Sequence, residues 1–467
     1  MALVFERVVT EGLGDLGYLI GDDSAGTAAV IDPQADVDVY LQLARRHKVA
    51  ITHVLQTHVH EDFLSGANEL AARLGNATLC GSAEDAAPYG YAHEALHDGD
   101  CLTFGGTVLT ARHTPGHTPE HMAFLVAEKG REQSPYAVFT GGSLLINAAG
   151  RTDLLGPDQA QALTAAQYRT LYDFYLTLDD GVILHPTHAH GSPCGASIGD
   201  RLSSTIGYER RFNPHLQCRG EDEFRQFALD GLPPRPSYYP RLKESNTAGP
   251  PALHGLPVAP PLPAKEFAKR VERGDAVVVD TRHMLAFGGG HIEGALNIGM
   301  AAQLPIWAGW MLEPRQPLLL VMESDGALDQ VLRLFLRTGF TRFAGYLVGG
   351  MTAWDNAGLQ VVAMAQVTAP DVHERPGDFT LVDVRAPQEW ASGHLPGARH
   401  VYLPDLPARA GELPRGKPVV VYCDSGYRAS IGASVLQRAG IRGVANMPGS
   451  MQAWKRAGYP MEGQPGG

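Results

Sequence analysis

The C-terminal half of this chain contains an internal repeat, which constrains the fold more than any other feature of the sequence. Asp280 and Asp383 lie 103 residues apart, and Trp354 and Trp454 lie 100 apart. The paired segments around them are 277–282 with 381–385, 291–295 with 394–398, and 348–354 with the stretch ending at Trp454. A duplicated unit of this size predicts two consecutive domains that share one fold.

Cys423 follows the apolar run 418–422 and opens a short loop that ends at Arg428. A helix is predicted after it, over 429–439. This order places the sulfur where backbone N–H groups converge, which stabilises an anion and lowers the pKa of a thiol. A lone Cys is more often a small buried hydrophobe. The order of strand, Cys, loop and Arg nevertheless indicates a reactive thiolate.

The loop from Cys423 to Arg428 resembles the active-site loop of the rhodanese family, together with segments 381–385, 393–398 and 448–454. The resemblance covers about residues 365–460 and implies sulfurtransferase chemistry. Cys423 would take up a sulfane sulfur as a persulfide and pass it to a nucleophilic acceptor. Arg428 and the loop residues would hold the negative charge, the loop residues being Asp424, Ser425, Gly426 and Tyr427.

The first copy of the repeat lacks this chemistry. Laying 317–321 on 418–422 places Met322 opposite Cys423 and Ala327 opposite Arg428. A thioether has no ionisable proton and cannot carry a persulfide. We therefore interpret this copy as a rhodanese-like spacer or docking domain.

The Pro-rich passage 249–263 predicts a stiff, extended linker. The chain then divides into domains over 1–248, 264–362 and 363–467. Its net charge of −12 argues against nucleic acid or an anionic membrane surface as a partner. The sequence starts without a signal-peptide pattern and its five cysteines form no even framework. We therefore expect a cytoplasmic protein, with homo-oligomerisation left open.

Histidines follow several predicted strands of the first domain. The strand over 51–57 leads into His58, His60 and Asp62, and further strand ends carry His117 and His188. Imidazoles on neighbouring strand ends can converge on zinc or iron. Three such strand ends spread over about 130 residues predict a metal site.

The order of these motifs resembles the metallo-β-lactamase fold, an αββα sandwich, and especially the persulfide dioxygenases and their rhodanese fusions. We therefore predict an α/β chain in which this sandwich precedes two rhodanese-like domains with parallel sheets. The resemblance departs from the family at two ligand positions. Phe63 stands where a His is usual, and Gly142 replaces the Asp that binds the metal.

In persulfide dioxygenases, the Asp at the position of Gly142 completes a single-iron site with the histidines that match His58 and His117. Because glycine has no side chain to coordinate a metal, we expect one iron, as Fe²⁺, on His58, His60 and His117. Zinc, or no metal, remains an alternative. Asp62, Asp153 and His188 would be additional ligands or would orient the ligands. Cys194 lies six positions after His188 and is a candidate second sulfur carrier.

The predicted function is the handling of persulfides in sulfur metabolism. The substrates would be a low-molecular-weight persulfide, such as glutathione persulfide, or thiosulfate. Two alternatives stay open: a sulfurtransferase with a degenerate scaffold domain, and a metallo-hydrolase of glutathione thioesters.

Overall fold

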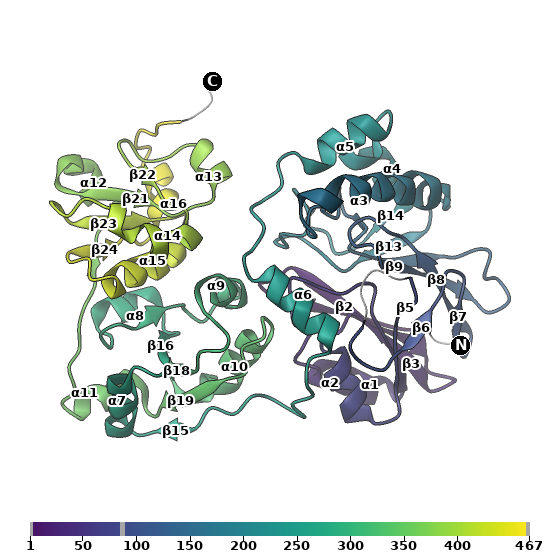
Figure 1. The fold of residues 1–467 in the computed structure, drawn as a ribbon, viewed down its shortest axis with the longest axis horizontal. Coiled ribbons are helices and arrows are strands. Elements are labelled where there is room, and N and C mark those ends of the chain that lie inside the picture. Colours follow the sequence, from purple (N-terminus) through teal and green to yellow (C-terminus); the bar gives the residue numbers. More distant parts are fainter. Residues whose placement is uncertain (1–2, 85–88, 464–467) are drawn as a thin grey trace. The chain divides into compact units, whose positions relative to one another are not determined.

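The computed structural model describes residues 3–84 and 89–463 (Figure 1). The outermost residues of the predicted first and last domains, 1–2 and 464–467, lie outside this described part. The chain forms two compact units. The N-terminal unit comprises 1–256 with 336–339, and the C-terminal unit comprises 257–335 with 340–467.

Two six-stranded sheets form the centre of the N-terminal unit. The first has the order β1-β2-β3-β4-β5-β6 and the second has the order β14-β13-β10-β9-β8-β7. The strands of the first sheet are β1 (Leu3–Thr10), β2 (Asp15–Asp22), β3 (Thr27–Ile31), β4 (Ala50–Leu55), β5 (Thr78–Ser82) and β6 (Glu94–Leu96). Those of the second are β7 (Cys101–Phe104), β8 (Thr107–His113), β9 (Met122–Glu128), β10 (Ala137–Gly141), β13 (Ile183–Pro186) and β14 (Ser204–Thr205).

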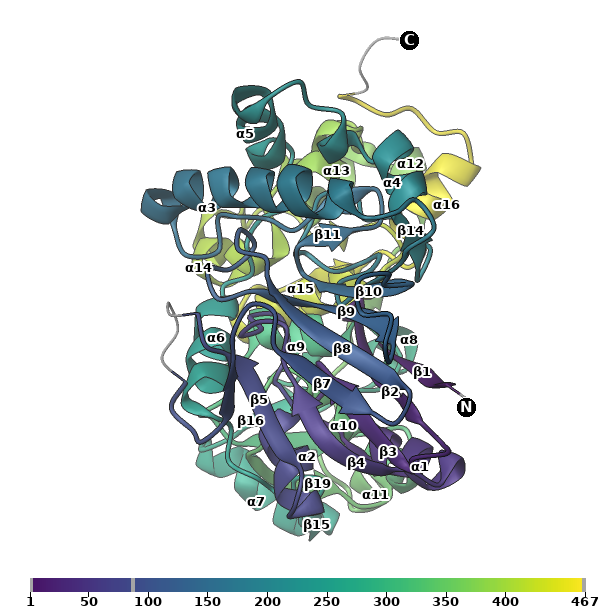
Figure 2. The same ribbon diagram turned by 90° about the vertical axis from the view of Figure 1, so that its right-hand side faces the viewer.

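Helices cover the outer faces of both sheets (Figures 1 and 2). Tyr40 and Leu70 pack α1 (Asp38–His47) and α2 (Ala67–Leu74) against the first sheet. On the second sheet, Leu171 and Phe224 belong to the core beneath α3 (Pro157–Arg169), α4 (Ile206–Phe212) and α5 (Glu221–Leu229). A third cluster, which includes Tyr18 and Phe124, fills the space between the sheets. The predicted αββα sandwich is therefore confirmed.

The predicted linker makes more contacts with the rest of the chain than its Pro-rich composition indicates. It begins directly after α6 (Tyr239–Ala248), and the N–H groups of Leu253 and His254 donate to Glu69 Oε2 at 2.6 and 3.0 Å. At its other end, β15 (Pro261–Leu262) pairs with β19 (Phe343–Leu347) in the next domain. Pro at such an edge costs no ladder hydrogen bond, so the passage can serve as linker and strand together.

The C-terminal unit contains two five-stranded parallel sheets, as predicted from the repeat. Their orders, β15-β19-β18-β16-β17 and β20-β24-β23-β21-β22, match position by position. The remaining strands are β16 (Val277–Asp280), β17 (Leu296–Asn297), β18 (Leu318–Val321), β20 (Ala365–Gln366), β21 (Thr380–Asp383), β22 (Arg399–His400), β23 (Val419–Tyr422) and β24 (Val444–Asn446).

Ten helices flank these two sheets in the described residues of this unit. In the first copy they are α7 (Ala264–Arg273), α8 (Met284–Gly289), α9 (Leu304–Met311), α10 (Leu328–Leu336) and α11 (Gly350–Asn356). In the second they are α12 (Ala369–Glu374), α13 (Pro387–Ala391), α14 (Leu406–Arg409), α15 (Tyr427–Arg438) and α16 (Ser450–Arg456). One buried cluster, which includes Met322 and Cys423, continues from one copy into the other. Across the described chain, no helix combines the length and apolarity needed to cross a membrane.

Candidate functional site

Three strand ends of the N-terminal unit bring their histidines together. His58 follows β4, His117 follows β8 and His188 follows β13, and all three side chains are buried. One ligand atom from each lies within 4.8 Å of the other two. The ring centroids of His58 and His117 are 4.9 Å apart, and His188 lies 5.4 Å from each. This arrangement can hold a metal ion.

Each of these rings is oriented through its Nδ1 atom. His58 Nδ1 lies 2.9 Å from Thr57 Oγ1, and His117 Nδ1 donates to the carbonyl oxygen of Arg151 at 2.8 Å. His188 Nδ1 pairs with Asp15 Oδ1 at 2.8 Å. Such partners fix the orientation of metal-binding histidines and leave Nε2 for the metal.

The protonation state of His58 and His117 fits a metal. His188 Nε2 is buried and has no hydrogen-bond partner among the described residues. Burial lowers the pKa of His117 to about 3 and that of His58 well below its usual value, so both rings are in the neutral, ligating form. Burial also acts to lower the pKa of His188, but Cys194, Asp62 and Asp15 outweigh it and raise that pKa.

His60 belongs to a second group, with Asp62 and His188. Its Nε2 atom lies 3.1 Å from Asp32 Oδ1, and its ring centroid lies 4.3 Å from that of Phe63. The sequence placed His60 with His58 and His117 and gave His188 only an additional role. In the structure, His188 is the residue common to both groups.

The glycine at position 142 leaves no room for the carboxylate that the family resemblance would place there. A Cβ at Gly142 would lie 2.3 Å from His117 Cδ2 and 2.7 Å from His117 Nε2. The Gly142 N–H donates to His121 Nε2 at 2.9 Å. His121, which was not among the predicted site residues, therefore holds this turn. The spacing of four residues between His117 and His121 is the sequence signal that could have indicated this role.

Asp153 and Cys194 are the two remaining predicted residues of this site, and only Cys194 lies beside a metal group. Asp153 forms a double ion pair with Arg151, at 2.7 and 2.8 Å, and belongs to neither metal group. Cys194 is buried beside the second group, with Sγ 3.4 Å from Asp62 Oδ2 and 3.6 Å from the hydroxyl of Tyr239. Burial raises the pKa of its thiol to about 11, so this sulfur is protonated.

In the C-terminal unit, Cys423 lies at the end of β23 and is 1% exposed. Its Sγ accepts a hydrogen bond from the Gly426 N–H at 3.1 Å, where α15 begins. Gly426 has a φ of 108°, which favours glycine. The sulfur therefore lies at the N-terminus of a twelve-residue helix, where partial positive charge stabilises a thiolate or a persulfide anion.

Arg428 is held beside this loop by Glu389. Its NH1 and NH2 groups donate to Oε2 and Oε1 of Glu389 at 2.5 and 2.8 Å. Burial acts to lower the pKa of Arg428, but Glu389 and Cys423 outweigh it and raise the pKa further. The guanidinium is thus a fixed cation, with its charge already shared with one carboxylate. Asp424 accepts from Gln452 Nε2 at 2.7 Å, which ties the loop to α16.

Met322 occupies the corresponding position of the first copy and is 1% exposed within the shared core. The structure places it at the end of β18, as Cys423 lies at the end of β23. The position of the candidate sulfur carrier in one copy thus contributes to packing in the other.

Known proteins match both parts of the chain. The profile of the metallo-beta-lactamase superfamily matches residues 16–188, and that of the rhodanese-like domain matches 263–357 and 368–457. Persulfide dioxygenase ETHE1 of Bos taurus is 29% identical over 210 residues, covering 44% of this chain and 72% of that protein. A probable metallo-hydrolase of Burkholderia pseudomallei is 31% identical over 243 residues, covering 45% and 79%.

Among solved structures, a metallo-beta-lactamase from Staphylococcus aureus is 28% identical with a TM-score of 0.66. The match covers 74% of this chain and 99% of that one, so the resemblance extends well beyond the first domain. The chain belongs to the metallo-beta-lactamase superfamily and continues into two rhodanese-like domains.

Proposed function

We propose that this chain handles persulfide sulfur, with sulfur transfer at Cys423 and oxidation of a low-molecular-weight persulfide in the N-terminal domain. The Cys423 loop is the observation that carries the proposal. Its sulfur accepts the Gly426 N–H at a helix N-terminus, and Arg428 is fixed beside it. These groups stabilise a negatively charged sulfur, which is the form that both accepts and donates a sulfane sulfur.

The transfer balances without an external oxidant. The Cys423 thiolate attacks the outer sulfur of thiosulfate, its sulfur–sulfur bond breaks, and sulfite leaves with the electron pair. An acceptor thiolate then attacks the outer sulfur of the Cys423 persulfide. The acceptor leaves as a persulfide anion, and the Cys423 thiolate is restored.

In the N-terminal domain, His58, His117 and His188 would hold one divalent metal, for which we propose iron. Bound iron would supply the redox chemistry that persulfide oxidation needs. The chain's own residues keep His58 and His117 neutral and orient them through Thr57 and Arg151. Asp15 orients His188. Overall, one persulfide, one dioxygen and one water give one thiol, one sulfite and two protons. Glutathione persulfide is the proposed substrate.

Metal analysis of anaerobically purified protein, combined with Cys423→Ser, tests this function. About one iron per chain and persulfide-dependent oxygen uptake would support the oxidation. Loss of thiosulfate:cyanide sulfurtransferase activity in Cys423→Ser would support the transfer, whereas full activity in that variant would refute it. Metal-free protein with full transferase activity would reduce the N-terminal domain to a scaffold.

The second candidate is hydrolysis of a glutathione thioester at two metals. Two ligand groups that share His188 favour it, and so does the match to a probable metallo-hydrolase. Two-metal hydrolysis uses ligands to hold both ions close together. Two zinc ions per chain and turnover of S-lactoylglutathione would replace the oxidation proposal with this one.

A further inference from the structure

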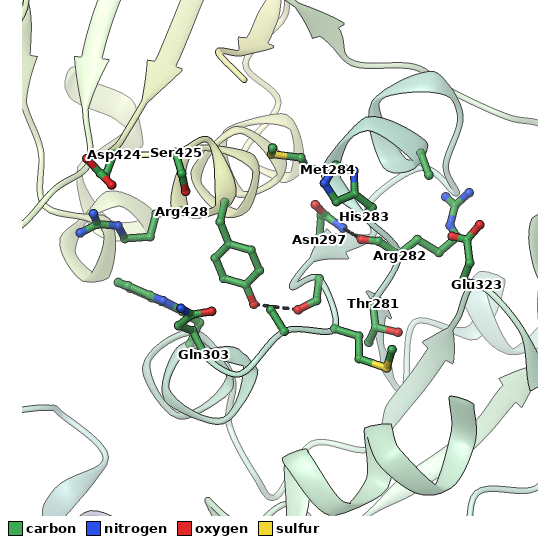
Figure 3. Close-up of a pocket in the computed structure, with 16 residues that line it drawn as sticks. Thr281, Arg282, His283, Met284, Asn297, Gln303, Glu323, Asp424, Ser425 and Arg428 are labelled. Carbon is green, nitrogen blue, oxygen red and sulfur yellow. Dashed lines mark hydrogen bonds between the residues drawn. The ribbon is translucent and has the colours of Figure 1, made fainter. Parts of the chain in front are cut away.

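A cavity of about 850 Å³ lies between the Cys423 loop and the first rhodanese copy (Figure 3). The second copy contributes Asp424, Ser425, Tyr427 and Arg428 to its lining. Most of the lining nevertheless comes from the copy that has no catalytic cysteine. Figure 3 shows Glu323 of that copy on the side of the cavity opposite Arg428, with Gln303 nearer to Arg428. The cavity therefore extends from the reactive loop along the first copy.

The first copy also holds the reactive loop in place. The Tyr427 hydroxyl donates to the carbonyl oxygen of Gly299 at 2.8 Å. A Cβ at Gly426 would lie 3.0 Å from Met284 Sδ, so this methionine packs directly against the turn that donates to Cys423. On α15, the Ser430 hydroxyl donates to Asn297 Oδ1 at 2.5 Å. These contacts make the first copy a structural part of the transferase site rather than a spacer.

The size of the cavity fits an organic molecule rather than an inorganic ion. A volume of about 850 Å³ lies within the range of about 300–1,000 Å³ that encloses ligands of drug size. Thiosulfate and cyanide have only a few atoms each and would fill only the end beside the loop. The wall away from the loop therefore has space for the body of a larger substrate.

The charge of the lining disfavours a small dianion along this wall. Arg282 is paired with Asp280 at 2.6 Å, and Arg428 is paired with Glu389. The exposed carboxylate of Glu323 adds negative charge. Apolar and neutral polar groups make up much of the rest, among them Met300 and Gln303. Such a lining suits apolar and amide contacts more than ionic ones.

We propose that the first copy is the thiol-binding half of the transferase site and selects a peptide-sized organic thiol as the sulfur acceptor. This inference rests on the proposed sulfur transfer at Cys423. The acceptor thiolate would attack the outer sulfur of the Cys423 persulfide while its body lies along Ala301 and Gln303. The bond between the two sulfurs breaks, and Cys423 leaves with the electron pair.

Two neighbouring alanines allow a matched test in the full chain. Ala301 lines the cavity, whereas Ala302 is exposed beside it and does not. Ala301→Trp fills the wall, and Ala302→Trp makes the same change outside it. Thiosulfate would be the donor, with cyanide, glutathione and pantetheine as separate acceptors.

With Ala301→Trp, the KM for glutathione, pantetheine or both should rise at least tenfold, and the KM for cyanide should change less than twofold. Ala302→Trp should leave all three values within twofold of the wild type. Equal effects of the two variants on every acceptor would overturn the inference. Gln303→Trp, at an exposed lining position, replaces Ala301→Trp if that variant does not fold.

The two proposals fail in distinguishable ways. If the wild type transfers no sulfur, or if Cys423→Ser transfers it fully, the proposed function is wrong. If the wild type transfers sulfur through Cys423 but Ala301→Trp leaves both organic acceptors unaffected, only the role of the first copy is wrong.

Discussion

Gly142→Asp would supply the carboxylate that the family resemblance leads one to expect, yet we predict that it destabilises the N-terminal unit. The new Cβ would lie 2.3 Å from His117 Cδ2, well inside van der Waals contact. His117 is buried and bonded to Arg151, so its ring can turn only by breaking that hydrogen bond. Overpacking costs about 1–3 kcal/mol. The lost hydrogen bond adds about 1 kcal/mol.

A loss of about 2–4 kcal/mol lowers a urea midpoint by about 1–2 M when the slope is about 2 kcal/mol/M. The distribution of tryptophans makes this measurable. Trp307, Trp310, Trp354, Trp390 and Trp454 all lie in the C-terminal unit. Tryptophan fluorescence therefore follows only that unit and should not change, while far-ultraviolet circular dichroism also reports the N-terminal unit.

Two control variants separate steric from electrostatic effects. Gly142→Ala introduces the same Cβ without a charge and should account for much of the loss. Gly181→Ala adds a Cβ that meets no atom within 4 Å in the described structure, and it should leave the midpoint unchanged. If Gly142→Asp unfolds at the wild-type urea concentration and binds as much metal, the ring of His117 moves freely and the reasoning is refuted.

Three further predictions concern other residues. Hydrogen bonds from Ser24 and Gly106 lower the pKa of Asp22 to about 2, so its stabilising effect is complete above about pH 4 and is lost as the pH falls through 2. Melting temperatures of Asp22→Asn and wild type should therefore differ at pH 7 and converge near pH 2; a constant difference would contradict this. Glu389→Gln should lower kcat for thiosulfate:cyanide transfer about tenfold, because Arg428 loses a charge-assisted, two-point partner; unchanged kcat would contradict it. His188→Ala should release most of the bound metal, and His60→Ala should release less. Metal analysis of the two variants would show this. The reverse order would instead favour the set His58, His60 and His117.

Much of the fold could be predicted because its signals are local or repeated. The repeat predicted two parallel-sheet domains, and the apolar run before Cys423 predicted the strand that is β23. The predicted strand over 51–57 corresponds to β4 at Ala50–Leu55. The helix predicted over 429–439 is α15, which begins two residues earlier because Gly426 already starts the turn at Tyr427.

The grouping of the histidines could not be predicted because it depends on contacts distant in sequence. His188 is oriented by Asp15, 173 residues earlier in the chain. His60 approaches Asp32 because β3 and β4 are parallel neighbours in the sheet. The spacing between His58 and His60 does not indicate that His60 lies beside Asp32 or that His188 lies beside Asp15. A pattern of ligands therefore predicted that a site exists, but not which of its members face one another.

The first rhodanese copy shows a related limit of motif reading. Its missing cysteine led to the interpretation of a spacer or docking domain, since a motif records only the residues that carry chemistry. Met322 took the position of the sulfur and became part of a core that both copies share. The contacts of Gly299, Met284 and Asn297 with the other copy belong to no motif, and they position the loop around Cys423. A copy that lacks the cysteine can thus still determine the surroundings of Cys423, because residues of both copies line the cavity beside that loop.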